Sequence, residues 1–189
     1  RPVEKLDIKK PVTKLRDAKF NLDLANWGAE SGTVVQFLPD DTIFETIDFD
    51  IKHFVSQLRE YAYLTGGIKF EIRDHRANFN YSFYFEGGIK AYLANLNRNK
   101  KVVNDNIFFT AREYDGVHVE AALQYNDSFT ENVICFANHL RNSEGGTHLT
   151  GFKSALTRSV NDYARKSNLL KEKDPNLSGE DLREGLTAI

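Results

Sequence analysis

Residues 151–170 read GFKSALTRSVNDYARKSNLL, and the spacing of their apolar side chains predicts a long amphipathic helix. The apolar positions recur every three or four residues and form one stripe of Phe152, Ala155, Leu156, Val160, Tyr163 and Ala164. At about 100° per residue, the opposite face carries Ser154, Arg158, Asn161 and Arg165. We therefore expect a helix with one packed side and one polar side.

Basic residues gather around this helix, although the whole chain is slightly acidic. Residues 141–173 hold seven basic and three acidic residues, which is a local charge of +4, whereas the formal net charge of the chain is −2. Arg158 and Arg165 project from the same face, where they could meet phosphate groups. A solvated helix face would carry the same residues, so the pattern leaves both interpretations open.

Strands and helices precede this helix without a strict strand-helix-strand order. Residues 51–64 have helical spacing with Asp50 as a plausible N-cap, a second helix is expected from Ile89, and a further helix after Ser178. Strands are expected at 68–72, 81–85, 117–125 and 133–137. This pattern indicates the α+β fold class, and the polar residues 74–78 suggest a domain boundary.

Composition favours a globular protein, with 41% hydrophobic and 28% charged residues. The single cysteine, Cys135, lies in an apolar run, where it is expected to be buried in a reducing compartment. The five histidines lack metal-ligand spacing, and no apolar stretch reaches the ~20 residues of a membrane span. Neither a metal site nor a membrane partner is therefore expected. Because the sequence contains no methionine and ends within an apolar run, we expect it to be a piece of a longer protein.

Six blocks of sequence, in a fixed order, give the chain a specific resemblance. They are FEGGIK (85–90), ALQYND (122–127), EGGTHL with GFK (144–149 and 151–153), ALTR (155–158), NDYAR (161–165) and GEDLREGL (179–186). In this order they resemble the B subunit of bacterial DNA gyrase and its paralogue, the topoisomerase IV B subunit. Residues 32–40, GTVVQFLPD, resemble the closing strand of that family's ATPase domain, whereas residues 9–30 are the least family-like.

The resemblance implies two domains. Residues 1–76 would be the C-terminal part of a split-β-sandwich ATPase domain of the GHKL type, and residues 77–189 a ribosomal-protein-like α/β transducer domain truncated before its Gln-Thr-Lys loop. ATP and Mg²⁺ would be bound mainly by residues outside this chain. Within it, Gly32 would let the backbone approach the nucleotide, and the Thr33 hydroxyl would support the adenine end through a water. No catalytic or metal-binding residue is expected in this piece.

The resemblance also implies a function, that of an ATP-dependent type II topoisomerase. Such an enzyme couples ATP binding and hydrolysis in an N-terminal clamp to DNA strand passage and supercoiling, and this piece alone is expected to be inactive. Arg158 matches the family's lumen-facing arginine and Arg165 shares its predicted face, so both are expected to face DNA.

The implied partners are double-stranded DNA, a gyrase A-type subunit in an A2B2 complex, and a second B subunit that associates on ATP binding. The implied location is the cytoplasm, at the nucleoid. Two alternatives remain open at this point. One is a stand-alone nucleic-acid-binding module with a ribosomal-protein-like fold, and the other is a structural dimerisation piece.

Overall fold

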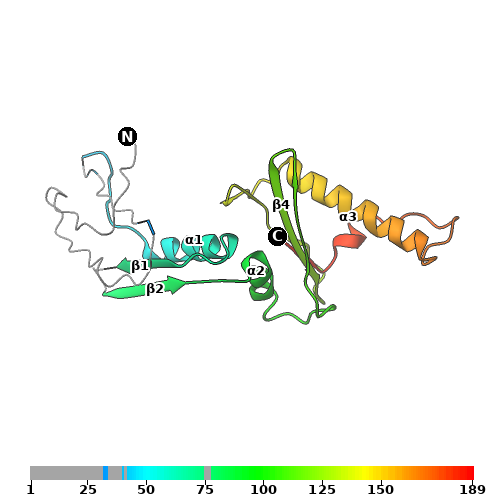
Figure 1. Cartoon of the computed structure of the whole chain (residues 1–189), viewed down its shortest axis with the longest axis horizontal. Coiled ribbons are helices and arrows are strands. Elements are labelled where there is room, and N and C mark those ends of the chain that lie inside the picture. The colour runs from blue at the N-terminus through cyan, green and yellow to red at the C-terminus, as the bar shows by residue number, and fades with distance from the viewer. Residues whose placement is uncertain (1–31, 34–39, 41, 75–77) are drawn as a thin grey trace. The chain divides into compact units, whose positions relative to one another are not determined.

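The computed structural model describes residues 32–33, 40, 42–74 and 78–189. The chain divides into two compact units, Arg1–Phe49 and Asp50–Ile189, and all helices and strands assigned in the described residues lie in the second unit. In chain order (Figure 1) they are α1 (Ile51–Leu64), β1 (Phe70–Asp74), β2 (Phe79–Phe83), α2 (Gly88–Leu96), β3 (Phe108–Tyr114), β4 (Val117–Tyr125), β5 (Asn132–Val133), β6 (Phe136–Ala137), β7 (Leu140–Arg141), α3 (Thr147–Lys166), the 3₁₀ helix η2 (Asp181–Arg183) and β8 (Leu186–Ala188).

Helix α1 confirms the prediction for residues 51–64. The Asp50 carboxylate caps its first turn by accepting a hydrogen bond from the Lys52 backbone N–H at 2.9 Å. Beyond the helix, Gly67 takes a φ of +86°, a left-handed conformation that glycine adopts without a steric penalty. The helix lies alongside the β1–β2 hairpin, as Figure 1 shows. The core between them is built on Val55, Ala62 and Phe83.

The β1–β2 hairpin bears on the expected domain boundary. The two strands pair antiparallel, from Phe70 opposite Phe83 to Asp74 opposite Phe79. A boundary between residues 76 and 77 falls between these paired strands, and α1 packs against both of them. The compact units instead divide the chain between Phe49 and Asp50. The assignment of 1–76 and 77–189 to two domains therefore stays a prediction.

An aromatic stack joins α1 to α2. The Tyr63 ring lies 3.6 Å from the Phe85 ring and 4.7 Å from the Tyr92 ring, centroid to centroid, and both pairs are stacked. The Tyr92 hydroxyl donates to the Glu60 carboxylate at 2.8 Å, and Arg141 binds the same carboxylate at 3.1 Å. Burial and this hydrogen bond raise the pKa of Tyr92 above its ordinary value, so Tyr92 keeps its proton.

The larger sheet has four strands in the order β3-β4-β8-β5. Strand β4 pairs antiparallel with both β3 and β8, whereas the short β5 pairs parallel with β8. Helix α2 packs against β4, where Ile89 and Leu93 form a buried cluster with Ala122. The described residues therefore combine helices with a mainly antiparallel sheet, a mixed architecture in line with the predicted α+β class.

Strand β4 lies where it was predicted, but its apolar alternation does not mark its buried face. Val117 and Val119 are 60% and 55% exposed, whereas Ala122 and Gln124, in the opposite phase, are buried. The reason is that α2 covers the Ala122 face, and Gln124 can be buried because the Asn97 side-chain amide donates to it at 3.0 Å.

That hydrogen bond belongs to a buried polar network where α2, β4 and β8 meet. The Thr187 hydroxyl, fully buried, donates to Asn97 Oδ1 at 2.9 Å and accepts from Asn126 Nδ2 at 3.0 Å and from Lys100 Nζ at 3.4 Å. In the part of the chain that the structure describes, no buried side-chain nitrogen or oxygen lacks a hydrogen-bond partner. The network therefore fixes β8 against α2 and β4 without leaving an unpaired polar atom.

The prediction of one buried strand at 133–137 is wrong. The run is divided because β5 pairs with β8 while β6 pairs with β7. Ile134, between the two strands, is buried at 7% exposure. Cys135 is only half-buried and is a free thiol whose Sγ lies 3.3 Å from the Asn142 carbonyl oxygen.

The helix expected after Ser178 is shortened to the single turn η2. Ser178 Oγ accepts a hydrogen bond from the Asp181 backbone N–H at 3.1 Å, at the start of this turn. The turn ends because Gly185 takes a φ of +71° and packs so closely on the Asn126 carbonyl that a Cβ there would clash. The chain then enters β8, whose three residues are all buried.

Candidate functional site

Helix α3 carries most of the candidate site and lies four residues earlier than the 151–170 prediction. It begins after Gly145 and Gly146, which take positive φ angles of 80° and 156°, and ends before Asn168, which takes a φ of 56°. Its last turn holds Arg165 and Lys166, cations that suit the negative end of the helix dipole. The side chains covered by the rest of the protein recur every three or four residues: Leu149, Phe152, Lys153, Leu156, Thr157, Val160, Asn161, Ala164 and Arg165.

The second half of α3 departs from the predicted apolar and polar faces. Asn161 is buried at 6% exposure and Arg165 is half-buried, whereas Tyr163, assigned to the packed stripe, is 65% exposed. The reason is that residues 167–177 fold back against this part of the helix and contact it through polar groups. In the first half of the helix, Ala155 was also assigned to the packed stripe and is exposed. Of the predicted polar face, Ser154 and Arg158 are exposed, as expected.

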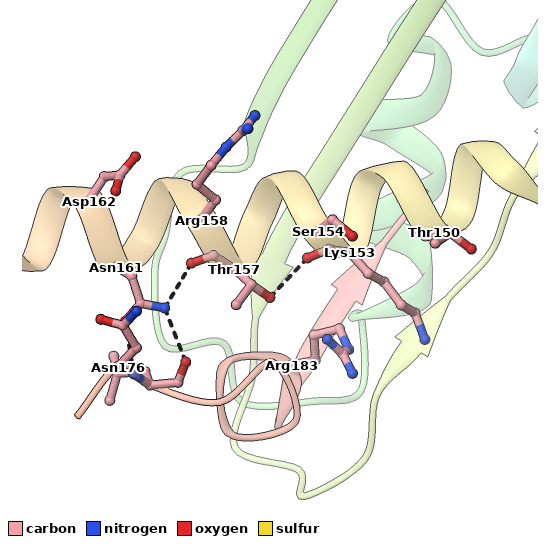
Figure 2. A pocket seen from close by; sticks show the side chains of 10 residues that line it. Thr150, Lys153, Ser154, Thr157, Arg158, Asn161, Asp162, Asn176 and Arg183 are labelled. Carbon is pink, nitrogen blue, oxygen red and sulfur yellow. Dashed lines mark hydrogen bonds between the residues drawn. The ribbon is translucent and has the colours of Figure 1, made fainter.

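A polar groove of about 540 Å³ runs beside α3 (Figure 2). Helix α3 forms most of the groove, and the chain before and within η2 completes it. Its lining residues are Thr150, Lys153, Ser154, Thr157, Arg158, Asn161, Asp162, Asn176, Leu177 and Arg183. In Figure 2, Arg158 rises from one side of the helix, while Asn161, Asn176 and Arg183 lie on the other side. Nine of these ten residues carry a hydroxyl, an amide or a charge, and three of them are cations that an anionic partner could contact.

Two of the three groove cations are paired with one carboxylate. Glu131 accepts from Lys153 Nζ at 2.5 Å and from Arg183 Nε at 2.8 Å. Partial burial would raise the pKa of Glu131, but the hydrogen bonds from Lys153 and Arg183 outweigh it and hold this pKa below its ordinary value. The carboxylate is therefore ionised at neutral pH and neutralises much of the charge of its two partners.

Arg158 is the groove cation that stays available. Its side chain is exposed, and it has no hydrogen bond or ion pair with any residue that the structure describes. Counting Lys153, Arg158, Arg183, Glu131 and Asp162, the groove has three positive and two negative charges, a net of +1. An anion entering the groove would therefore meet Arg158 as its free partner.

Arg165 lies near Arg158 in the sequence but has a different environment. Its guanidinium makes hydrogen bonds to two backbone carbonyls and one side-chain amide of the residues that follow the helix: Lys171 O at 2.9 Å, Asp174 O at 2.8 Å, and Asn176 Oδ1 at 2.6 and 3.1 Å. The structure thus places Arg158 and Arg165 on one helix, and of the two only Arg165 forms hydrogen bonds with other described residues. Whether either residue faces DNA stays a prediction.

The two predicted nucleotide-binding residues lie in the first unit. Gly32 and Thr33 are exposed and belong to no helix or strand. Residues 34–39, the rest of the segment that resembles the closing strand of the ATPase domain, lie outside the described residues. The nearest described contact is at Asp40, whose carboxylate accepts from the Thr42 hydroxyl at 2.6 Å and from its N–H at 2.9 Å. The role of Gly32 and Thr33 in a nucleotide pocket stays a prediction.

Within residues 32–33, 40, 42–74 and 78–189, no three His, Cys, Asp or Glu side chains are grouped to hold a metal ion. Of the helices in these same ranges, none is both long and apolar enough to cross a membrane.

Sequence reasoning missed the Glu131 ion-pair cluster and the groove that it supports. Glu131 and Arg183 lie 52 positions apart, and Lys153 lies on a third element. Each residue alone looks like an ordinary surface charge, and no local spacing connects them. The cluster could have been predicted only with knowledge that β5 pairs with β8, because this pairing brings the segments of Glu131 and Arg183 together.

Comparison with known proteins gives a consistent result. A family model described as DNA gyrase B matches residues 88–189. The DNA gyrase B subunit of Clostridium acetobutylicum is 51% identical over 161 residues, which is 85% of this chain and 25% of that protein. The DNA topoisomerase 4 B subunit of Streptococcus pneumoniae is 44% identical over 161 residues, again 85% of this chain and 25% of the relative. The chain thus spans about a quarter of the length of these relatives.

The fold also resembles a solved structure. The 43K ATPase domain of Thermus thermophilus gyrase B, crystallised with an aminocoumarin, aligns with a TM-score of 0.71 and 35% sequence identity. The alignment covers 79% of this chain and 41% of that one. Groove residues from Thr150 to Arg183 all lie within the region that the family model matches.

Proposed function

Because this chain belongs to the DNA gyrase B family, we propose that it is part of an ATP-dependent type II DNA topoisomerase and that α3 offers a contact for the DNA backbone. The whole enzyme would couple ATP binding and hydrolysis to strand passage and supercoiling. One observation carries the DNA contact: Arg158 is exposed and unpaired among the described residues, in a polar groove within the matched region. A cation free of internal partners can neutralise a phosphate without first breaking an ion pair.

The proposal assigns a different domain to each of two parts of the chain. Residues 1–76 would complete a GHKL-type split-β-sandwich ATPase domain, and residues 77–189 would form the transducer domain. Gly32 and Thr33 would then line the nucleotide pocket, and their exposure leaves both accessible to a ligand. As the resemblance to the family implies, Mg²⁺ and the catalytic base would be supplied from outside this chain. We accordingly expect the chain alone to be inactive.

The proposed partners follow from the proposed enzyme. They are double-stranded DNA, a gyrase A-type subunit in an A2B2 complex, and a second B subunit that associates when ATP binds. The proposed location is the cytoplasm, at the nucleoid. Phosphate contacts position a protein on DNA without reading bases, so Arg158 would contribute to all DNA sequences alike.

The test is Arg158→Gln in the full-length B subunit, measured by binding to a short DNA duplex across a salt series. Removing one phosphate contact should lower the slope of log K against log salt by about 0.9. Arg98→Gln is the matched control, because Arg98 is also exposed but lies outside the groove, and its slope should equal that of the wild type.

The melting temperature of both variants should stay close to that of the wild type, because exposed substitutions usually change stability by less than about 0.5 kcal/mol. An unchanged slope for Arg158→Gln would mean that this side of α3 is a solvated helix face, and the proposed contact would be rejected.

A further inference from the structure

We propose that Arg165 is a positioning residue, which holds residues 167–177 as one wall of the groove and does not itself bind DNA. The inference rests on the proposed DNA contact at Arg158 and assigns a different task to the second arginine. It predicts that the charge of Arg165 matters less than the geometry of its guanidinium.

The hydrogen bonds of Arg165 are the first support. An arginine side chain has five N–H donors in a planar fork. Four hydrogen bonds run from Arg165 to Lys171, Asp174 and Asn176, at 2.6 to 3.1 Å. Hardly any donor capacity is left for a phosphate, whereas Arg158 has all of its donors free of described partners.

A second side chain, one turn earlier on α3, also holds this segment by hydrogen bonds. The Asn161 side chain, buried at 6% exposure, donates to the Leu177 carbonyl at 3.1 Å and accepts from the Leu177 N–H at 2.8 Å. Within the segment, the Asp174 carboxylate accepts from the Lys171 N–H at 2.7 Å. Residues 171–177 are therefore fixed to the helix at both ends and closed on themselves between those ends.

Residues 171–177, held in this way, form part of the groove. Asn176 and Leu177, the residues held by Arg165 and Asn161, both line it together with Arg158. Figure 2 shows Asn161 and Asn176 close together on the side of α3 opposite Arg158. If the hydrogen bonds of Arg165 and Asn161 were lost, residues 171–177 would be less ordered in the free protein. DNA binding would then have to order them, and this entropic cost would lower the affinity for DNA.

Two substitutions separate positioning from direct binding. Arg165→Lys keeps the positive charge but loses the planar fork, so a phosphate contact would survive and the multiple hydrogen bonds would not. Asn176→Ala removes an acceptor of Arg165 without removing any charge. The matched control is Asn95→Ala, at an exposed position on α2 outside the groove.

The experiment uses the full-length B subunit and a short DNA duplex of random sequence. We expect Arg165→Lys and Asn176→Ala to bind DNA roughly threefold to tenfold more weakly than the wild type, with an unchanged salt slope. Hydrogen exchange should accelerate at the Lys171 and Leu177 amides in both variants. Asn95→Ala should match the wild type in affinity, and Arg158→Gln should lower the slope.

Three results would overturn the inference. Wild-type affinity in both variants despite faster exchange would mean that Arg165 serves stability alone. Wild-type affinity in Arg165→Lys with a lowered slope in Arg165→Gln would make Arg165 a direct phosphate ligand. Unchanged exchange at Lys171 and Leu177 would mean that Arg165 does not hold the segment.

Failure of the proposed DNA contact gives a different signature. In that case Arg158→Gln keeps the wild-type slope, whatever the exchange data show. Arg165→Lys and Asn176→Ala can still bind DNA more weakly in that case. Arg165 would then keep its positioning role, and the phosphate contact would lie elsewhere along the segment.

Discussion

Thr187→Val removes one hydroxyl from the centre of the buried network that joins α2, β4 and β8. Thr187 is fully buried, and its hydroxyl takes part in hydrogen bonds with Asn97, Asn126 and Lys100. Valine has nearly the same shape, so the substitution creates no large cavity. The loss of stability should therefore come from hydrogen bonding alone.

The size of the effect follows from the two short hydrogen bonds, at 2.9 and 3.0 Å. Each neutral hydrogen bond contributes a net ~0.5–1.5 kcal/mol, and a buried polar group left without a partner costs ~1–3 kcal/mol. Asn126 Nδ2 keeps only a long contact of 3.5 Å to Asn97, so it is poorly compensated. We expect a loss of about 2–3 kcal/mol in the free energy of unfolding, or roughly 4–12 °C in Tm for a chain of this size.

The measurement is urea unfolding of this chain, followed by circular dichroism, with thermal melts alongside. Thr110→Val on β3 is the matched control, because Thr110 is half-buried on a strand and has no side-chain hydrogen bond to a described residue. Its unfolding free energy should stay within about 0.5 kcal/mol of the wild type. If Thr187→Val proves as stable as this control, the network contributes no net stability and the reasoning is refuted.

Two other predictions concern the ion-pair cluster and the proposed nucleotide pocket. Glu131→Gln should reduce stability by about 1 kcal/mol or less at neutral pH, because the cluster is partly exposed. Since the folded-state pKa of Glu131 is lowered, this difference should be full above the ordinary carboxyl pKa and should vanish as pH falls through the lowered value; a gap in urea unfolding that is constant with pH would contradict it. Thr33→Ala in the full-length protein should weaken nucleotide binding by ~1–3 kcal/mol in calorimetry and leave Tm unchanged, because a hydroxyl partner is lost at an exposed position. Unchanged affinity with a lowered Tm would instead indicate that Thr33 serves the stability of the fold and not nucleotide binding.

Local spacing was enough to predict α1, α2 and β4, but no strand was expected at β3 (Phe108–Tyr114), which pairs with β4. Helix α1 and its Asp50 cap, helix α2, and the position of β4 follow from periodicity over fewer than twenty residues. The faces of these elements were harder to predict, because burial of Gln124 and Asn161 depends on partners outside the local pattern. Thr187 and Asn97, for example, lie 90 positions apart.

The candidate site, too, could be predicted only in part from the sequence. The exposure of Arg158 follows from the helical wheel, because it depends only on the apolar stripe of α3. The role of Arg165 cannot be predicted from the helical wheel, because the wheel contains no information on how residues 167–177 turn back to the helix. The Glu131 cluster depends on three elements that are brought together by the sheet, and no short motif encodes it.

The β3–β4 hairpin bears on how this chain behaves at high concentration. Strand β3 lies at one edge of the four-stranded sheet in the described residues, and Tyr114 and Val117 at the tip of the hairpin are 84% and 60% exposed. An outer strand with apolar side chains is a template on which another copy can add a strand. The charges at this edge are the exposed Arg112 and Glu113 on the strand and the Lys90 ammonium, 5.3 Å from the centre of the Phe109 ring. Self-association of concentrated samples should therefore begin at β3, and added charge along this strand, with the α3 groove left intact, is the way to keep the chain monomeric.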